Sequence, residues 1–292
     1  MNNNHTKDDL LIRAFTGLKQ HSFKALHEAL ATNALHNSAG RCVVKDEPIY
    51  GKDDFIAHEL LACPKNFSKE FSIGELSETA YNAGYHQAFD KRTLNNCIEY
   101  ANISPFTVNI SVISALSPDF FEGLIKKLEE YTLKPNDIIF EILEHNVDRN
   151  ASISHLEKMK KQGFRFALDD YSNGKSHLNR LQVFGDLVDF IKIDGPLIRA
   201  ALDGEYKKNG SVIATVDDYN SAIQALNDHY NNQTTPLPPL VGEFVRNRQD
   251  ADRLYDMGFS GVQGRHLNSQ DFAYAAKVTS NEFKVNADFK FT

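Results

Sequence analysis

Short apolar runs recur along the chain from residue 41 onward, and each of the later ones ends in polar side chains. The first is Cys42-Val43-Val44, and the other seven end at His58-Glu59, Asn109, Glu141, Asp169-Asp170, Lys192-Ile193-Asp194, Glu243 and Gln263. Apolar runs of this length, separated by helical spacers, are typical of buried strands of a parallel sheet. The pattern therefore predicts eight strands.

Helical patterns fill intervals between these runs, for example at residues 120–131, 151–162 and 248–257. The intervals from Glu59 to Asn109 and from Lys192 to Glu243 have room for a second helix each. Strand and helix that alternate eight times predict an α/β fold, a TIM-like (β/α)8 barrel, whose active site forms at the carboxyl ends of the strands. We expect this barrel to span residues 41–275.

The segments outside the barrel have other patterns. Apolar residues between Leu11 and Leu30 recur at spacings of three to five, which predicts a short helical extension over residues 1–40. This extension is either a cap on the barrel or a contact surface for a second copy or a protein partner. Residues 276–292 are expected to form a peripheral tail.

Composition narrows the possible partners and the compartment. The 292 residues carry 39 acidic and 32 basic side chains, and a net charge of −7 argues against nucleic-acid polymers or anionic membranes as partners. No apolar run approaches the ~18 residues of a membrane span, and the first residues do not resemble a signal peptide. Three cysteines without C-x-x-C spacing exclude a disulfide scaffold and fit the reducing cytoplasm.

Oxygen-bearing side chains stand at the ends of four successive predicted strands. They are Glu59, Asn109, Glu141, Asp169 and Asp170, and in a barrel they would converge on one mouth. Carboxylate and amide oxygens are hard ligands that suit Mg²⁺ or Mn²⁺ rather than zinc. A cation would also relieve the repulsion within such a cluster. The adjacent aspartates could bridge or separately hold two ions, as in paired-metal sites that act on phosphodiesters.

The remaining strand ends offer groups that could act on a substrate. Lys192 could orient a water molecule or neutralise a phosphate oxygen, and Glu243 could serve as a general base. Gln263 could bind another polar group. The structural alternative for Lys192 is a salt bridge with Asp194 at the barrel rim.

Seven short motifs follow one another in a fixed order. They are Glu59-Leu60-Leu61, Asn109-Ile110-Ser111, Glu141-Ile142-Leu143-Glu144, Asp169-Asp170-Tyr171-Ser172-Asn173-Gly174, Lys192-Ile193-Asp194, Gly242-Glu243-Phe244-Val245 and Gln263-Gly264. Over residues 41–272 this order resembles the EAL-domain family of cyclic di-GMP phosphodiesterases, whose motifs read Glu-Ala-Leu, Asn-Leu-Ser, Glu-Ile-Thr-Glu, Asp-Asp-Phe-Gly-Thr-Gly, Lys-Ile-Asp, Ala-Glu-Gly-Val and Gln-Gly. Each motif alone is weak, whereas seven in order are specific.

The resemblance implies hydrolysis of cyclic di-GMP to linear pGpG by a homodimer that requires Mg²⁺ or Mn²⁺, with two ions in the site. It implies metal ligands at the five oxygen-bearing residues, with Lys192 holding the attacking water and Glu243 acting as base. It further implies that Glu144 braces the loop of residues 171–176, which in this family couples dimer contacts to activity. Gln263, Glu47 and Leu61 are implied to contact the substrate.

Several positions depart from the family pattern. Cys63 stands where an arginine is usual, Glu47 where a glutamine is usual, and Arg246 where a second glutamate is usual. Ser172 and Asn173 replace the glycine and threonine of the loop. Intact metal ligands beside an altered substrate grip favour a weakened or retuned enzyme. The alternative is a catalytically silent module that binds a nucleotide or a protein. The interpretation as an unrelated barrel enzyme such as a lyase is not favoured, because this sequence has no phosphate-binding glycine motif near its last two strands.

No GGDEF-like, PAS-like or response-regulator domain is expected beside the barrel. An input signal is therefore expected to arrive through residues 1–40, through oligomerisation or through a separate partner.

Overall fold

The computed structural model describes residues 42–267, apart from 53–54, 65–76, 78–79, 82–83, 102–103, 146, 232 and 234. The predicted helical extension at 1–40 and the predicted tail at 276–292 lie outside the described residues. The domain boundaries at 40 and 275 therefore stay predictions.

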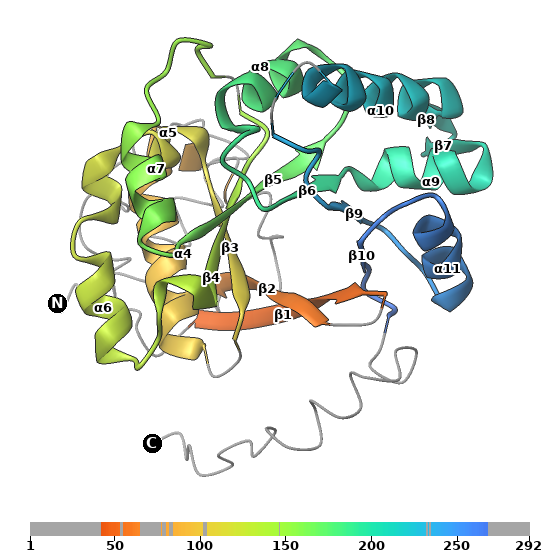
Figure 1. Ribbon diagram of the computed structural model, residues 1–292. Helices are drawn as coiled ribbons and strands as arrows, with labels where there is room; N and C mark the ends of the chain where they lie inside the picture. The colour runs from red at the N-terminus through yellow and green to blue at the C-terminus, as the bar shows by residue number, and fades with distance from the viewer. Residues whose placement is uncertain are drawn as a thin grey trace, which may run out of the picture. The chain divides into compact units, whose positions relative to one another are not determined.

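Eight strands close into a barrel, which confirms the predicted TIM-like fold (Figure 1). Around the barrel their order is β1-β10-β9-β6-β5-β4-β3-β2. Their bounds are β1 Cys42–Gly51, β2 Phe55–Pro64, β3 Phe106–Ile110, β4 Ile138–Ile142, β5 Arg165–Tyr171, β6 Phe190–Ile193, β9 Leu240–Gly242 and β10 Gly261–Gln263. Each of the eight predicted apolar runs lies within or overlaps one of these strands.

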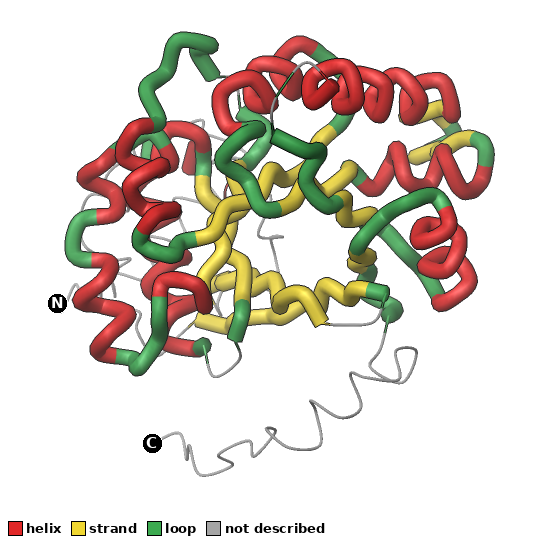
Figure 2. The backbone as a smooth tube through the Cα atoms, viewed as in Figure 1, coloured by secondary structure: helices red, strands yellow, loops and turns green. Residues whose placement is uncertain are grey.

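Helices occupy the intervals that the sequence assigned to them (Figure 2). They are α4 His86–Tyr100, α5 Val112–Ala115, α6 Leu124–Glu130, α7 Ser154–Lys161, α8 Lys175–Phe184, α9 Gly195–Asp203, α10 Val216–Asn231 and α11 Arg248–Asp256, with 3-10 turns at Pro118–Phe121 and Pro135–Asp137. The pattern at 120–131 is divided because Gly123 adopts a φ of +75° just before α6.

Two features differ from a regular barrel of parallel strands. Strand β1 runs antiparallel to β10, with Ile49 opposite Gln263. Only residues 52–54 connect β1 to β2, and a parallel neighbour would need a crossover of a dozen residues or more. In addition, β7 (Glu205–Lys208) and β8 (Ser211–Thr215) form a hairpin between α9 and α10. Its turn residues Asn209 and Gly210 both have positive φ, as a type I′ turn requires.

The chain divides into two compact units. Among the described residues, the first unit contains 42–46, 58–169 and 175–189, and the second contains 47–57, 170–174 and 190–267. The core of the first unit includes the fully buried Phe106, Phe140 and Phe166, whereas that of the second includes Ile191 and Val262. Among the described residues, no helix combines the length and apolar character needed to cross a membrane.

Candidate functional site

In the first unit, the register of β2 to β5 places four predicted site residues on one face. Glu59 lies opposite the residue two positions before Asn109, and Asn109 lies opposite Glu141. Asp169 stands two residues beyond the partner of Glu141 on β5. Paired residues and alternate residues of parallel strands point to the same face of the sheet. The side chains of Glu59, Asn109, Glu141 and Asp169 therefore share a face.

The three carboxylates among these side chains are buried, Asn109 is half-buried, and the amide oxygen of Asn109 lacks a donor. Glu59, Glu141 and Asp169 are only 7%, 0% and 6% exposed. The Nδ2 of Asn109 donates a hydrogen bond to Oε1 of Glu59 at 2.7 Å, whereas its buried Oδ1 accepts none. A buried acceptor without a donor costs free energy that a cation at the oxygen would remove. Three buried carboxylates and this amide oxygen fit Mg²⁺ or Mn²⁺.

The two adjacent aspartates depart from the geometry of a regular strand. Successive strand residues point to opposite faces, yet carboxylate oxygens of Asp169 and Asp170 lie within 4.8 Å of one another. Asp170 has a φ of +45°, in the left-handed region that aspartate tolerates better than most residues. This local turn interrupts the alternation, so that both carboxylates can approach one cation or two neighbouring cations.

In the second unit, Lys192 and Glu243 form a buried ion pair. Lys192 on β6 lies opposite Val241 of β9, and Glu243 follows two residues later. The Lys192 Nζ and Glu243 Oε1 are 2.9 Å apart, with side-chain exposures of 1% and 13%. An oxygen of Glu243 also lies within 4.8 Å of one of Asp170. The Lys192 ammonium group and the Glu243 carboxylate are thus paired, and the Asp170 carboxylate lies close to that of Glu243.

Two of the predicted substrate contacts also lie in the second unit. Gln263 is buried in β10, and its backbone carbonyl oxygen accepts a hydrogen bond from the backbone N–H of Val245 at 3.1 Å. Glu47 on β1 pairs with Arg265 at 3.3 Å, with side-chain exposures of 26% and 83%. An exposed pair of this kind contributes only ~0–1 kcal/mol. The Glu47 carboxylate can therefore exchange partners at little cost.

The remaining predicted site residues lie on β2 and just beyond β4. Glu144 is exposed just beyond the end of β4, and Leu61 is half-buried in β2. Cys63 belongs to β2, but its side chain lies outside the described residues.

A buried network that no sequence pattern singled out supports the end of β3. The Asp90 carboxylate on α4 accepts hydrogen bonds from the backbone N–H of Ser111 (2.8 Å), from its hydroxyl (2.7 Å) and from the hydroxyl of Tyr81 (2.6 Å). Burial raises the pKa of Asp90 although these bonds oppose the shift. Ser111 follows Asn109 by two residues and caps α5. Asp90 therefore fixes the segment that carries Asn109.

Relatives named for one activity match part of the chain. A probable cyclic di-GMP phosphodiesterase, PdeA of Escherichia coli, is 25% identical over 185 residues, which are 60% of this chain and 23% of the relative. PdeA of Borreliella burgdorferi, a cyclic di-GMP phosphodiesterase, is 28% identical over 175 residues, which are 59% of this chain and 24% of the relative. The chain thus spans about a quarter of the length of these curated relatives.

Solved structures share the fold. The FimX EAL domain of Pseudomonas aeruginosa, bound to c-di-GMP, is 19% identical with a TM-score of 0.58, and the match covers 82% of this chain and 94% of that one. The family model described as the EAL domain matches residues 35–270. The resemblance inferred from seven motifs is confirmed, and the chain belongs to the EAL domain family.

Proposed function

We propose that this chain is a metal-dependent phosphodiesterase that hydrolyses cyclic di-GMP to linear pGpG, with substrate binding retuned by its departures from the family pattern. The observation that carries the proposal is the buried face of β2 to β5, on which Glu59, Asn109, Glu141 and Asp169 meet. Membership of the EAL family and the names of its curated relatives support the choice of substrate.

Mg²⁺ or Mn²⁺ would be held by Glu59, Asn109, Glu141, Asp169 and Asp170, and two ions are proposed. The unsatisfied Oδ1 of Asn109 and the close oxygens of the two aspartates support this donor set. When bound, the metal would supply positive charge that stabilises the negative charge developing on the phosphoryl oxygens.

Glu243 would take the proton of the attacking water, and Lys192 would hold that water in place. The 2.9 Å ion pair between them supports these roles, because it fixes the carboxylate beside a donor. A base must be held within hydrogen-bond reach of the proton that it removes.

The substrate would be contacted by Gln263, Glu47 and Leu61. A carboxylate at Glu47 would accept hydrogen bonds from the N–H groups of guanine after release from its exposed pair with Arg265. Glu144 would brace the loop of residues 171–176. The homodimer, the protein partner of the N-terminal helices and the cytoplasmic location stay predictions.

Hydrolysis of cyclic di-GMP by the purified full chain, followed by chromatography of pGpG, tests the proposal. The substitution Glu59→Gln removes one ligand charge at nearly constant volume, and we expect it to abolish turnover while the circular dichroism spectrum is unchanged. The matched control is Glu129→Gln, which changes an exposed glutamate of α6 and should leave turnover intact. Ca²⁺ should inhibit, because its longer bonds and looser geometry misplace the reacting groups.

Full activity in excess chelator, or in Glu59→Gln, would refute the metal-dependent mechanism. Binding of cyclic di-GMP and Mn²⁺ without any hydrolysis would instead identify a silent nucleotide-binding module.

A further inference from the structure

Arg180 on α8 is a fully buried cation that binds two strand ends. Its side chain is 0% exposed. Its Nη1 donates to the carbonyl oxygen of Ile142 at the end of β4 (2.9 Å) and to that of Asp169 on β5 (2.8 Å). Its Nη2 lies 3.1 Å from Nδ1 of His177. Burial of a guanidinium is costly unless its N–H groups are hydrogen-bonded, so these contacts fix its position.

The histidine contact also has a definite direction. Burial, together with the charge of Arg180, lowers the pKa of His177 to about 4. The imidazole is therefore neutral near pH 7, and its Nδ1 can accept the hydrogen bond from Arg180. The guanidinium is thus held from its own helix as well as from the two strands.

The two carbonyl groups lie close in the chain to the proposed ligands. Ile142 directly follows Glu141, and the carbonyl of Asp169 belongs to the peptide that joins it to Asp170. The left-handed φ of +45° begins immediately after this peptide. Such a conformation persists only where the surrounding structure determines it. The hydrogen bond from Arg180 supplies a constraint at that point.

We infer that Arg180 is a positioning residue for the metal site, because it fixes the peptide between Asp169 and Asp170 and the end of β4 just beyond Glu141. The inference rests on the proposed function and deepens it. Arg180 touches neither metal nor substrate in this role. It acts through the backbone at the ends of β4 and β5.

The sign of the effect on metal affinity separates this role from the alternatives. Removal of a nearby positive charge would, by electrostatics alone, tighten the binding of a cation. Loss of positioning would weaken that binding, and substitution of groups that orient metal ligands typically costs about 10–100-fold in affinity. The inference therefore predicts weaker binding despite the loss of a positive charge.

The test is a titration of the full chain with Mn²⁺, in which electron paramagnetic resonance measures the free ion. We expect Arg180→Met to raise the dissociation constant about 10–100-fold, and Arg180→Lys, which keeps a donor and the charge, to raise it less. The control is Arg199→Met, which removes another buried arginine whose partners Asp203 and Asp250 are not proposed ligands. It should lower the melting temperature and leave the dissociation constant unchanged.

An unchanged or tighter Mn²⁺ affinity in Arg180→Met, with a native circular dichroism spectrum, would overturn the inference. Arg180→Lys provides the same comparison if the methionine variant does not fold. Turnover of cyclic di-GMP by the wild type would in that case leave the proposed function standing. A wild type that neither binds Mn²⁺ nor hydrolyses the dinucleotide would overturn the proposed function, and the inference with it.

Discussion

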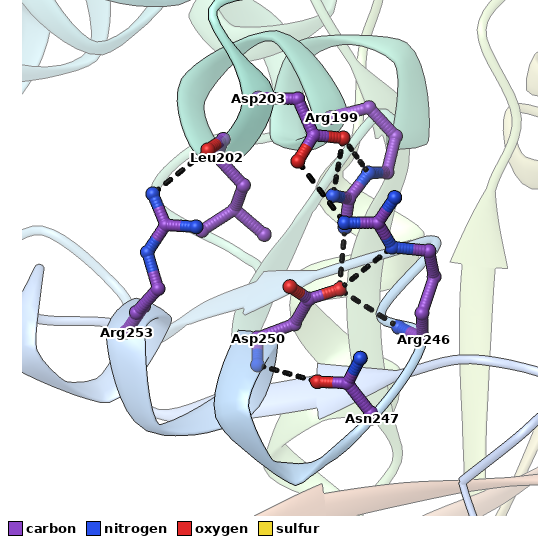
Figure 3. A network of polar contacts seen from close by, with 7 residues as sticks. All are labelled: Arg199, Leu202, Asp203, Arg246, Asn247, Asp250 and Arg253. Carbon is purple, nitrogen blue, oxygen red and sulfur yellow. Dashed lines mark hydrogen bonds and ion pairs between the residues drawn. The ribbon is translucent and has the colours of Figure 1, made fainter.

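Substitution of Asp250 by alanine should destabilise the second unit more than substitution of an exposed aspartate on the same helix would. The Asp250 carboxylate lies in the first turn of α11, and its side chain is 6% exposed. Its Oδ2 accepts hydrogen bonds from Nη1 of Arg199 (2.7 Å) and from Nε of Arg246 (3.0 Å), as Figure 3 shows. Both arginines also bind Asp203, each at 3.0 Å. Two arginines and two aspartates thus connect α9, α11 and the segment that follows β9.

The magnitude follows from what the substitution leaves behind. Removal of one partner of a buried ion pair typically costs 3–5 kcal/mol, and we take the lower end, ~3 kcal/mol, because Arg199 keeps Asp203 as a partner. At roughly 2–4 °C per kcal/mol for a chain of this size class, the melting temperature should fall by ~6–12 °C.

Calorimetry or thermal circular dichroism measures this change, and the same helix supplies a matched control. Asp252, two residues later on α11, forms an exposed pair with Arg248, with side-chain exposures of 52% and 43%. Asp252→Ala should therefore cost only ~0–1 kcal/mol. A cost of Asp250→Ala no larger than that of Asp252→Ala would refute the reasoning.

The stabilisation should also depend on pH with a definite sign. Burial opposes ionisation of Asp250, but the hydrogen bonds from Arg246 and Arg199 outweigh it, and the pKa of Asp250 lies below its ordinary value. Since the pKa is lower in the folded chain than in the unfolded one, the stabilisation is complete above about pH 4 and is lost as the pH falls through the folded pKa. The difference between wild type and Asp250→Ala should shrink over that acid range.

Two further predictions concern β6, β9 and the residues after them. Lys192→Ala should lower kcat by roughly 10²–10⁴-fold with little change in KM, because its proposed role is to position the reacting water; an effect on KM alone would make it a phosphate anchor. Gly195→Ala should destabilise the fold, because the new Cβ would lie 2.2 Å from Cγ of Phe244, whereas in a Phe244→Gly background it should cost little. Additive costs in urea denaturation would contradict that contact.

The barrel strands could be predicted from the sequence because each one contains an apolar run, and all of these runs but the first end in polar residues. The hairpin of β7 and β8 was missed, although its Asn209-Gly210 turn is a strong hairpin signal. Strand β7 consists of Glu205, Tyr206 and two lysines and lies largely exposed, so that no apolar run marked it. The antiparallel β1 was likewise hidden, since an apolar run does not show the direction of its strand.

The residues at the strand ends could also be predicted as candidates, whereas the groups that hold them could not. Arg180 and Asp90 lie on helices, where a charged residue usually faces solvent. Their partners include backbone groups 38 and 21 residues away in the chain, of Ile142 and Ser111. A contact with a backbone group leaves no pattern of side chains in the sequence. The left-handed φ of Asp170 is equally invisible, because it depends on the surrounding structure.

The departures at Phe244 and Arg246 belong to the support of the barrel rather than to its chemistry. Position 244 has a φ of +53°, which explains a glycine in the family motif, and here a phenylalanine adopts it with its ring against Gly195 and 6.5 Å from that of Tyr206. Arg246 binds Asp203 and Asp250, contacts that a glutamate there could not make. Two substitutions on either side of Val245 thus connect the segment after Glu243 to α9 and its surroundings. The same segment carries the proposed base, so the two departures can stabilise its position without altering the group that reacts.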